Sequence, residues 1–419
     1  MGDTPPTPVA VDAVWRPTWT QAVSDYRGED DEAPFEDATV RMTLPASIGG
    51  RQVRIELSNQ YSDEPARLGH VAVGSAGVFA DMTVDGEPLV VLPAGRSVWT
   101  DPVDLSIAEG ADVVVDVYLP KHTPYATAGG FLYERLTGDQ AGTAEPLAQD
   151  PEGRTTANHE GREFPAVSAD AADDSDTGDG DTGWSLAAGG PFLRSIEVRG
   201  GDARAVVVAL GSSSTAMGWP QYAASNLSGV AVLNRGISGN RLLRDAPPAM
   251  RSWGPAGLGR FEDDVLRTHA ATHLVIAYNN NDWSLPGRVT PIDELPTVDE
   301  LTAAYEDLVG RAEQAGLDVL LATMTPLSPE QRDDAAREAV RAGLNDWIRT
   351  SGYPVLDFDA AVRDDAMPRA LNPAYAAPDD THPNVAGERL LGQVAAASIE
   401  EVLSRTTPRE PRQFGRAES

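Results

Sequence analysis

The chain has 419 residues, of which 41% are hydrophobic, and a formal net charge of −31. A chain this long exceeds one ordinary hydrophobic core, so we expect two domains. So acidic a surface repels phosphate groups, which argues against a nucleic-acid partner. No apolar run approaches the roughly 18 residues of a membrane helix, so we expect no membrane insertion. Cysteine is absent, which excludes disulfides, a thiolate nucleophile and cysteine metal ligands.

The acidic composition leaves two interpretations open. Lys121 is the only lysine, and every other cationic side chain is an arginine. This fits adaptation to high salt, where screening removes self-repulsion, and equally a GC-rich genome. The first residues lack the basic and apolar regions of a secretory signal. We therefore expect a cytoplasmic protein as the sequence stands, or a secreted one if a leader has been removed.

The first half of the chain has the pattern of short strands. Residues 1–14 are proline-rich and predict a disordered N-terminus. Alternating apolar residues and turn residues then predict an all-β sandwich or jelly-roll-like domain over 15–200, interrupted by a solvated acidic loop at 148–185. The expected strands are 39–44, 53–57, 71–73, 89–92, 113–119 and 192–198.

The second half, 201–405, alternates apolar runs with helical patterns. Such continuous apolar runs are typical of strands that are buried on both faces. Alternation with helices predicts an α/β fold with a doubly wound parallel sheet, followed by a disordered tail at 406–419. The expected strands are 205–210, 230–233, 273–277, 319–322 and 354–356, and the helical patterns lie at 301–312, 336–348 and 390–399.

Polar clusters follow the apolar runs, where ligands bind in parallel α/β sheets. They are residues 211–215, 234–240, 278–282 and, before the last helix, 379–384. A serine at the start of a helix, a histidine near the chain end and an aspartate three residues before it could form a nucleophile, a base and an orienting acid. These are Ser213, His382 and Asp379. Gly239 and Asn281 could offer a backbone N–H and a side-chain amide to an oxyanion.

These clusters resemble the four signature blocks of the SGNH/GDSL hydrolases. Residues 211–215 are similar to the first block, Gly-Asp-Ser-x-Thr, and residues 234–240 resemble the second block, in which Gly239 matches the oxyanion glycine. Residues 279–282 are similar to the third block, Gly-x-Asn-Asp, and residues 379–384 match the fourth, Asp-x-x-His-Pro-Asn. The resemblance implies a flavodoxin-like sheet (the SGNH hydrolase fold) and a Ser213–His382–Asp379 triad. It also implies an oxyanion hole made of the Ser213 N–H, Gly239 and Asn281. The N-terminal half, with residues 18–20 near its start, resembles the domain preceding the catalytic one in a two-domain branch of the family.

Two positions depart from the family pattern. Ser212 replaces an aspartate that, in the family, braces the oxyanion loops by hydrogen bonding. Asn279 replaces a glycine, and its side chain could crowd the pocket. The choice of Ser213 over Ser212 or Ser214 rests on its spacing from Gly211 and Thr215.

The resemblance implies a serine esterase that hydrolyses small acyl, acetyl-type esters through an acyl-enzyme, without a cofactor or metal. The expected partner is a small-molecule or carbohydrate ester. We expect Trp219, Asn279 and Trp283 to line the substrate pocket, although the tryptophans could equally be core residues. The alternative is a catalytically impaired SGNH-like protein that binds carbohydrate or another ligand. Whether the sandwich binds glycans or serves as a lid stays open.

Overall fold

The computed structural model describes residues 14–28, 35–143, 184–187, 190–326, 331, 334–379 and 381–405. Of the predicted flexible segments, 1–13, 148–183 and 406–419 lie outside these ranges. The last two residues of the predicted acidic loop belong to strand β14. No helix in the described ranges is both long enough and apolar enough to cross a membrane.

The described part of the N-terminal half consists of antiparallel sheets, as expected. One five-stranded sheet has the order β1-β15-β4-β10, with β9 also paired to β4, and a six-stranded sheet has the order β14-β13-β3-β11-β6-β7. The first contains β1 (Arg16–Thr20), β4 (Gly50–Ser58), β9 (Ser97–Trp99), β10 (Val103–Ile107) and β15 (Leu193–Arg199). The second contains β3 (Ala38–Pro45), β6 (His70–Ser75), β7 (Val78–Asp81), β11 (Asp112–Leu119), β13 (Tyr133–Thr137) and β14 (Trp184–Ala187). Two small pairs join β2 (Ser24–Asp25) to β12 (Thr127–Ala128) and β5 (Ala66–Leu68) to β8 (Val90–Leu92).

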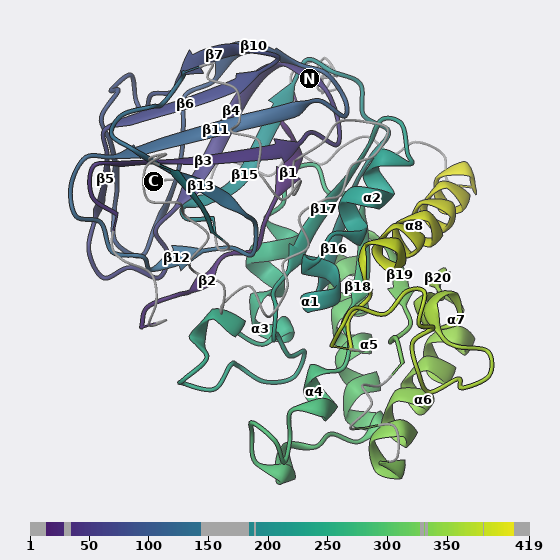
Figure 1. The fold of residues 1–419 in the computed structure, drawn as a ribbon. Coiled ribbons are helices and arrows are strands. Elements are labelled where there is room, and N and C mark those ends of the chain that lie inside the picture. The colour runs from purple at the N-terminus through teal and green to yellow at the C-terminus, as the bar shows by residue number, and fades with distance from the viewer. Residues whose placement is uncertain are drawn as a thin grey trace, which may run out of the picture.

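Alternation along these strands builds the sandwich core. In β4, Val53, Ile55 and Leu57 are fully buried, whereas the residues between them are only partly covered. Inward-facing residues of β3 and β11 belong to the same hydrophobic core, so the two sheets pack on each other (Figure 1). Strand β15 returns to this sandwich as its last strand, as the alternation at 192–198 predicts.

The C-terminal half contains a parallel sheet, as predicted. Its order, β17-β16-β18-β19-β20, is flavodoxin-like. Its strands are β16 (Ala205–Gly211), β17 (Val230–Gly236), β18 (His273–Ala277), β19 (Asp318–Ala322) and β20 (Val355–Leu356). The α-helices are α1 (Ser213–Ala216), α2 (Trp219–Ser225), α3 (Gly257–Phe261), α4 (Asn281–Ser284), α5 (Val298–Gln314), α6 (Ala335–Thr350), α7 (Phe358–Val362) and α8 (Val385–Arg405). Two short 3₁₀ helices are η3 (Arg251–Trp253) and η5 (Ile292–Glu294), and η4 (Glu262–Leu266) is a π-helix.

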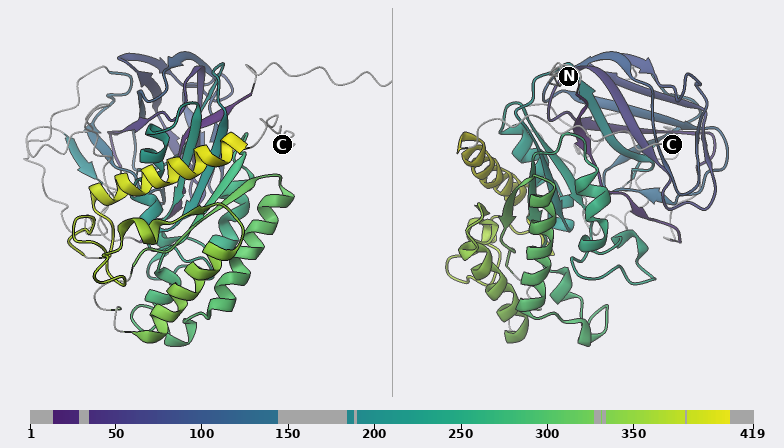
Figure 2. Two further views of the ribbon diagram at one scale, coloured as in Figure 1. Left: turned by 90° about the vertical axis from the view of Figure 1, so that its right-hand side faces the viewer. Right: turned by 180° about the vertical axis from the view of Figure 1, so that it is seen from behind.

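Helices cover both faces of this sheet, which explains its continuous apolar strands. In β16, Val207 and Ala209 share one core with α2, α7 and α8, whereas Val206 and Val208 share the other with α3, α5 and α6. Figure 2 shows α8 crossing one face of the sheet. Helix α5 begins with a capping box between Thr297 and Glu300.

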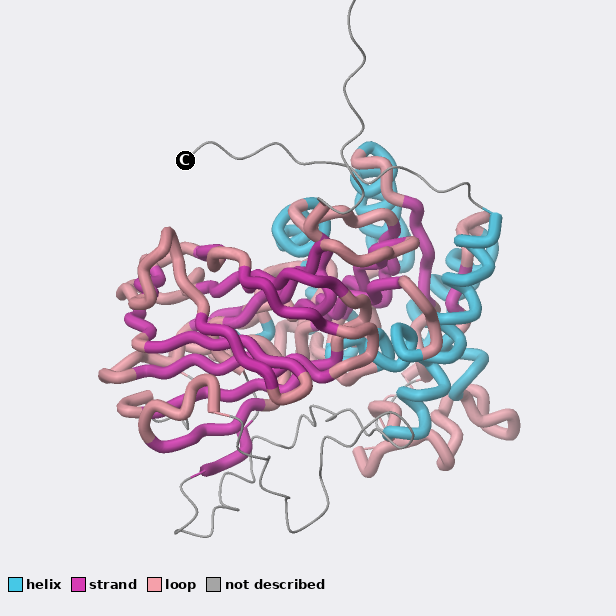
Figure 3. Tube along the Cα trace, turned by 90° about the horizontal axis from the view of Figure 1, so that it is seen from above, coloured by secondary structure: helices cyan, strands magenta, loops and turns pink. Residues whose placement is uncertain are grey.

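The sandwich packs against the β17 side of the parallel sheet. Strand β1 contacts β17, and the Thr20 hydroxyl donates to the carbonyl of Asn234 at 3.2 Å. Figure 3 shows strands of the sandwich gathered on one side of the molecule and helices on the other. The two halves therefore meet close to the chain segment that follows β17.

Candidate active site

Strand register brings three of the polar clusters to one edge of the sheet. Gly211 pairs with Gly236 in β17 and with Ala277 in β18, so these strands end side by side. Helix α1 begins at Ser213, directly after β16, and α4 begins at Asn281, soon after β18. Segments that are 20 to 70 residues apart in sequence therefore meet at the carboxyl edge, as the parallel-sheet rule predicts.

A serine, a histidine and an aspartate form a continuous hydrogen-bonded chain at this edge. Ser213 Oγ lies 3.0 Å from His382 Nε2, and His382 Nδ1 lies 2.5 Å from Asp379 Oδ2. The backbone N–H groups of Thr381 and His382 each donate to Asp379 Oδ1 at 3.0 Å. The loop before α8 thus holds the acid and the imidazole together.

The ionisation of Asp379 follows from these contacts. Its partial burial works to raise the pKa, but the hydrogen bonds from the His382 ring and from the backbone N–H groups outweigh burial and lower it. The side chain of His382 is 16% exposed and that of Asp379 is 33% exposed. A carboxylate therefore faces the imidazole at neutral pH, while water and small molecules can still approach.

The neighbouring serines have different surroundings. The Ser212 side chain is fully buried, and its Oγ accepts a long hydrogen bond of 3.4 Å from the Asn279 N–H. Ser214 Oγ accepts from Asn279 Nδ2 at 2.7 Å. Of the three serines, Ser213 alone contacts the ring of His382.

The predicted oxyanion donors lie in loops that contact each other. Gly239 has a φ of +74°, and a Cβ atom there would collide with the Trp253 ring. Asn281 Nδ2 donates to the carbonyl of Asn240 at 2.9 Å, and its second amide hydrogen has no acceptor among the residues that the structure describes. Within the described ranges, the backbone N–H groups of Ser213 and Gly239 have no hydrogen-bond acceptor.

Asp282 ties together the two loops that carry the predicted oxyanion donors, a role that we did not expect. Its carboxylate accepts the N–H groups of Leu242 at 2.7 Å and Leu243 at 2.9 Å. Burial raises the pKa of Asp282 to about 6, although these two donors oppose the shift. The sequence signal that could have predicted this role is the position of Asp282 directly after Asn281, in the third signature block. Arg241, which follows Asn240, forms an ion pair with Glu294.

The tryptophan part of the pocket prediction is corrected by the structure. Trp219 and Trp283 have no exposed surface. Trp219 packs edge-on against Phe358, and the Trp283 indole contacts the sulfur of Met324. Aromatic side chains close to an active-site motif are equally suited to the core, and here packing of the helices on the sheet buries both.

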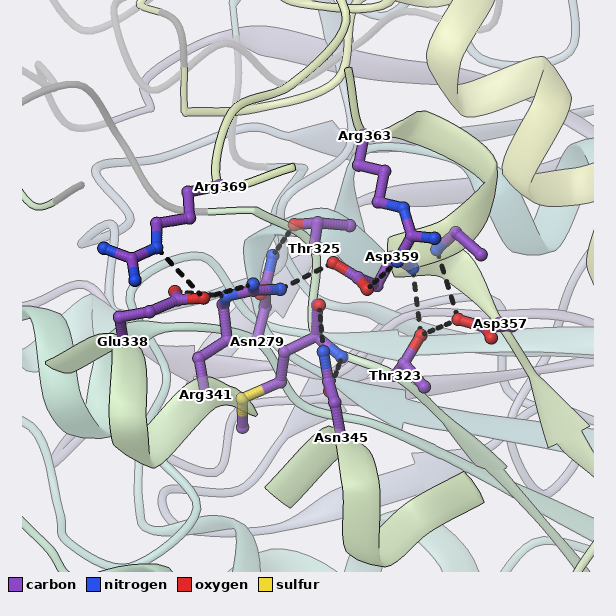
Figure 4. Close-up of polar contacts among 12 residues, drawn as sticks. Asn279, Thr323, Thr325, Glu338, Arg341, Asn345, Asp357, Asp359, Arg363 and Arg369 are labelled. Atoms are coloured by element: carbon purple, nitrogen blue, oxygen red, sulfur yellow. Dashed lines mark hydrogen bonds and ion pairs between the residues drawn. The ribbon is translucent and has the colours of Figure 1, made fainter. Parts of the chain in front are cut away.

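Asn279 lies at the predicted edge of the parallel sheet, but only 6% of its surface is exposed. Its Nδ2 donates to Ser214 Oγ and to Thr325 Oγ1, each at 2.7 Å, and its Oδ1 is buried without a partner among the described residues. Where the family has glycine, this side chain thus fills the space between the ends of β16, β18 and β19. Figure 4 shows it beside Thr325, next to the buried ion pairs of Arg341 with Glu338 and Asp359.

Comparison with known proteins places this domain in a family. Residues 195–390 match the model of the GDSL-like Lipase/Acylhydrolase family. An acetylxylan esterase from Geobacillus stearothermophilus aligns at 21% identity and a TM-score of 0.37, covering 47% of this chain and 95% of its own. A GDSL-like lipase from Bacteroides thetaiotaomicron aligns at 21% identity and a TM-score of 0.35, covering 48% of this chain and 89% of its own. No curated protein matches the chain. The C-terminal half of this chain is a GDSL-like lipase/acylhydrolase domain.

Proposed function

We propose that this chain is a serine esterase that cleaves small acyl esters through an acyl-enzyme, with Ser213 as nucleophile, His382 as base and Asp379 as orienting acid. The observation that carries the proposal is the pair of contacts at 3.0 Å and 2.5 Å that join the hydroxyl, the imidazole and the carboxylate. Both lie within the reach that general-base activation of a hydroxyl requires.

The reaction has two halves. His382 Nε2 takes the proton of Ser213 as Oγ attacks the ester carbonyl, and Asp379 stabilises the imidazolium that forms. His382 then gives this proton to the leaving alcohol as the carbon–oxygen bond breaks. In the second half, His382 takes a proton from water, which attacks the acyl-enzyme, and returns it to Ser213 Oγ.

Three donors are assigned to the negative oxygen of the tetrahedral intermediate. They are the N–H groups of Ser213 and Gly239, which have no other acceptor in the described ranges, and the second amide hydrogen of Asn281. Removing one such donor typically costs about 10²- to 10³-fold in kcat.

The substrate class proposed is a short acyl ester, with an acetylated carbohydrate as the natural candidate. The covered side chain of Asn279, standing where the family has glycine, favours a short acyl group. Hydrolysis rates across a series of p-nitrophenyl esters from acetate to octanoate test the acyl length, and acetylated xylo-oligosaccharides test the alcohol part.

The nucleophile is tested with Ser213→Ala and p-nitrophenyl acetate. We expect loss of the burst and of turnover, and loss of covalent labelling by a serine-reactive phosphonate. Ser225→Ala is the matched control, because this hydroxyl caps the end of α2 and should leave turnover unchanged. Wild-type turnover in Ser213→Ala would refute the assignment. A wild-type protein that is neither active nor labelled would instead support the ligand-binding alternative, to which Ser212 and Asn279 point.

A further inference from the structure

Asn240 lies in the loop after β17, next to Gly239, and contacts the segment after β18 that carries Asn281. Its carbonyl accepts from Asn281 Nδ2 at 2.9 Å, and its own Nδ2 donates to two backbone carbonyls at 2.7 Å each. Its Oδ1 accepts the Tyr278 hydroxyl at 2.9 Å and Arg260 Nε at 3.0 Å. Because Asn240 is 1% exposed and all these groups are paired, its orientation is fixed, and it fixes the Asn281 amide in turn.

Arg260, on α3, bonds several of the chain segments that form this edge. One terminal nitrogen donates to the carbonyl of Gly211 at 2.7 Å, and the other donates to the carbonyl of Arg235 and to Asp264, each at 2.8 Å. Together with the contact to Asn240, one planar guanidinium therefore joins the end of β16, the end of β17 and the loop that follows β17. Arg260 is 5% exposed, so this guanidinium is buried and links these segments through charge-assisted hydrogen bonds.

The sandwich contacts the partner of Arg260, the Asp264 carboxylate, through Arg194. Arg194, on β15, approaches Asp264 Oδ1 at 3.4 Å and donates to the carbonyl of Asp263 at 2.8 Å. It also lies 3.7 Å from Glu56 on β4. Asp264 is thus shared by Arg260 of the α/β domain and Arg194 of the sandwich.

We propose that Arg260 is a positioning residue for the oxyanion site and that the sandwich, through Arg194 and Asp264, holds Arg260 in place. The inference rests on the proposed function, which assigns Asn281 to the oxyanion. Arg260 touches no reacting atom and acts through Asn240. An oxyanion donor lowers the barrier only if it is already aimed when the charge develops, so a loosened Asn240 lowers kcat more than it raises KM. The N-terminal domain is then part of the catalytic framework.

The test compares Arg260→Met with Arg41→Met. Arg41 is as buried as Arg260, and it pairs with Asp116 inside the sandwich. It is distant in sequence from every residue of the candidate site. Both variants should lower Tm. Arg260→Met should also lower kcat for p-nitrophenyl acetate by about 10- to 100-fold with KM changed by less than about twofold, part of the effect of losing one oxyanion donor. Arg41→Met should keep kcat within about twofold of wild type.

Three more variants keep the proposal falsifiable if Arg260→Met does not fold. Tyr278→Phe removes one donor to Asn240 and keeps the ring, and Arg194→Met cuts the link to the sandwich. Each should lower kcat by about 3- to 10-fold, since each removes one hydrogen-bonded support. Arg260→Lys keeps the charge but cannot span the same acceptors, so it should stay well below wild-type kcat.

The outcomes separate this proposal from the proposed function. If Ser213→Ala is inactive while folded Arg260→Met, or Tyr278→Phe and Arg194→Met together, keep wild-type kcat, the positioning role is wrong and the esterase assignment stands. Full recovery in Arg260→Lys would overturn it as well, because charge alone would then suffice. Wild-type activity in Ser213→Ala would overturn both.

Discussion

Replacing Glu388 with glutamine is expected to stabilise the protein increasingly as the pH rises. Glu388 lies in α8 and is 1% exposed. One carboxyl oxygen accepts the backbone N–H of Trp219 at 2.8 Å, and the other has no partner in the described ranges. Burial raises the pKa of Glu388 well above its ordinary value of 4.5, although the Trp219 N–H works to lower it. The folded protein therefore keeps this carboxyl neutral at a pH where the unfolded chain ionises it.

The sign and size follow from proton linkage. Between the ordinary pKa of 4.5 and the raised pKa of Glu388, the folded state binds one more proton than the unfolded state, so wild-type stability falls as the pH rises. The slope is at most about 1.4 kcal/mol per pH unit, so the stability of wild type relative to Glu388→Gln falls by up to this amount for each pH unit until the pH passes the raised pKa. Below pH 4.5 the two proteins should have a constant difference in stability, because both carry a neutral side chain.

The assay is urea unfolding of both proteins at a series of pH values from 4 to 8. Glu400→Gln, on the same helix, is the control. Glu400 is half-exposed, and its hydrogen bond with Arg204 lowers the pKa of the carboxyl group. The Glu400 carboxylate therefore stabilises the fold at pH values above the pKa that it has in the unfolded chain, and this stabilisation is lost as the pH falls. Glu400→Gln should therefore show a pH trend of opposite sign. A stability difference between Glu388→Gln and wild type that does not change with pH would refute the reasoning, because Glu388 would then be ionised in the fold.

Asp379→Asn should lower kcat for p-nitrophenyl acetate by about 10³- to 10⁴-fold, because an amide cannot stabilise the His382 imidazolium. A kcat within tenfold of wild type would contradict the assigned role of Asp379. Gly239→Ala should lower both Tm and kcat, since φ is +74° there and the new Cβ would collide with the Trp253 ring. Gly86→Ala is its control: with φ at +79° and open space around it, it should lose about 1–2 kcal/mol of stability and keep its kcat. Equal kcat in the two glycine variants would show that the Gly239 amide is not used.

The sequence predicted the parallel sheet and most of its strands because the signal there is local. A strand covered by helices on both faces must be apolar throughout, and residues 205–210 and 273–277 satisfy this without reference to any partner. Strands with a weaker local pattern were missed. β1 (Arg16–Thr20) is buried along its whole length although it contains an arginine, a proline and two threonines, because it lies between β15 and the second domain.

The site was predicted as far as motif spacing allowed. Three blocks at the ends of apolar runs and a fourth before the last helix pointed to Ser213, His382 and Asp379 as a triad. The structure brings the three side chains into hydrogen-bonding contact, and their catalytic roles stay a prediction. Burial could not be predicted in the same way. The helical pattern at 336–348 did not indicate that α6 buries Arg337 and Arg341, which bind the carbonyl of Trp283 and the carboxylate of Asp359, respectively.

The sequence by itself determined the chemistry available at the carboxyl ends of the strands, because parallel pairing aligns those ends wherever the apolar runs stop. Tertiary structure decided which groups are aimed and which are enclosed. Arg260 belongs to no motif, and its acceptors lie 4 to 49 residues away along the chain. Only packing of α3 against the sheet, with the sandwich behind it, brings a single guanidinium within reach of all of them, since a hydrogen bond depends on distance and angle in space and leaves no periodic trace in the sequence.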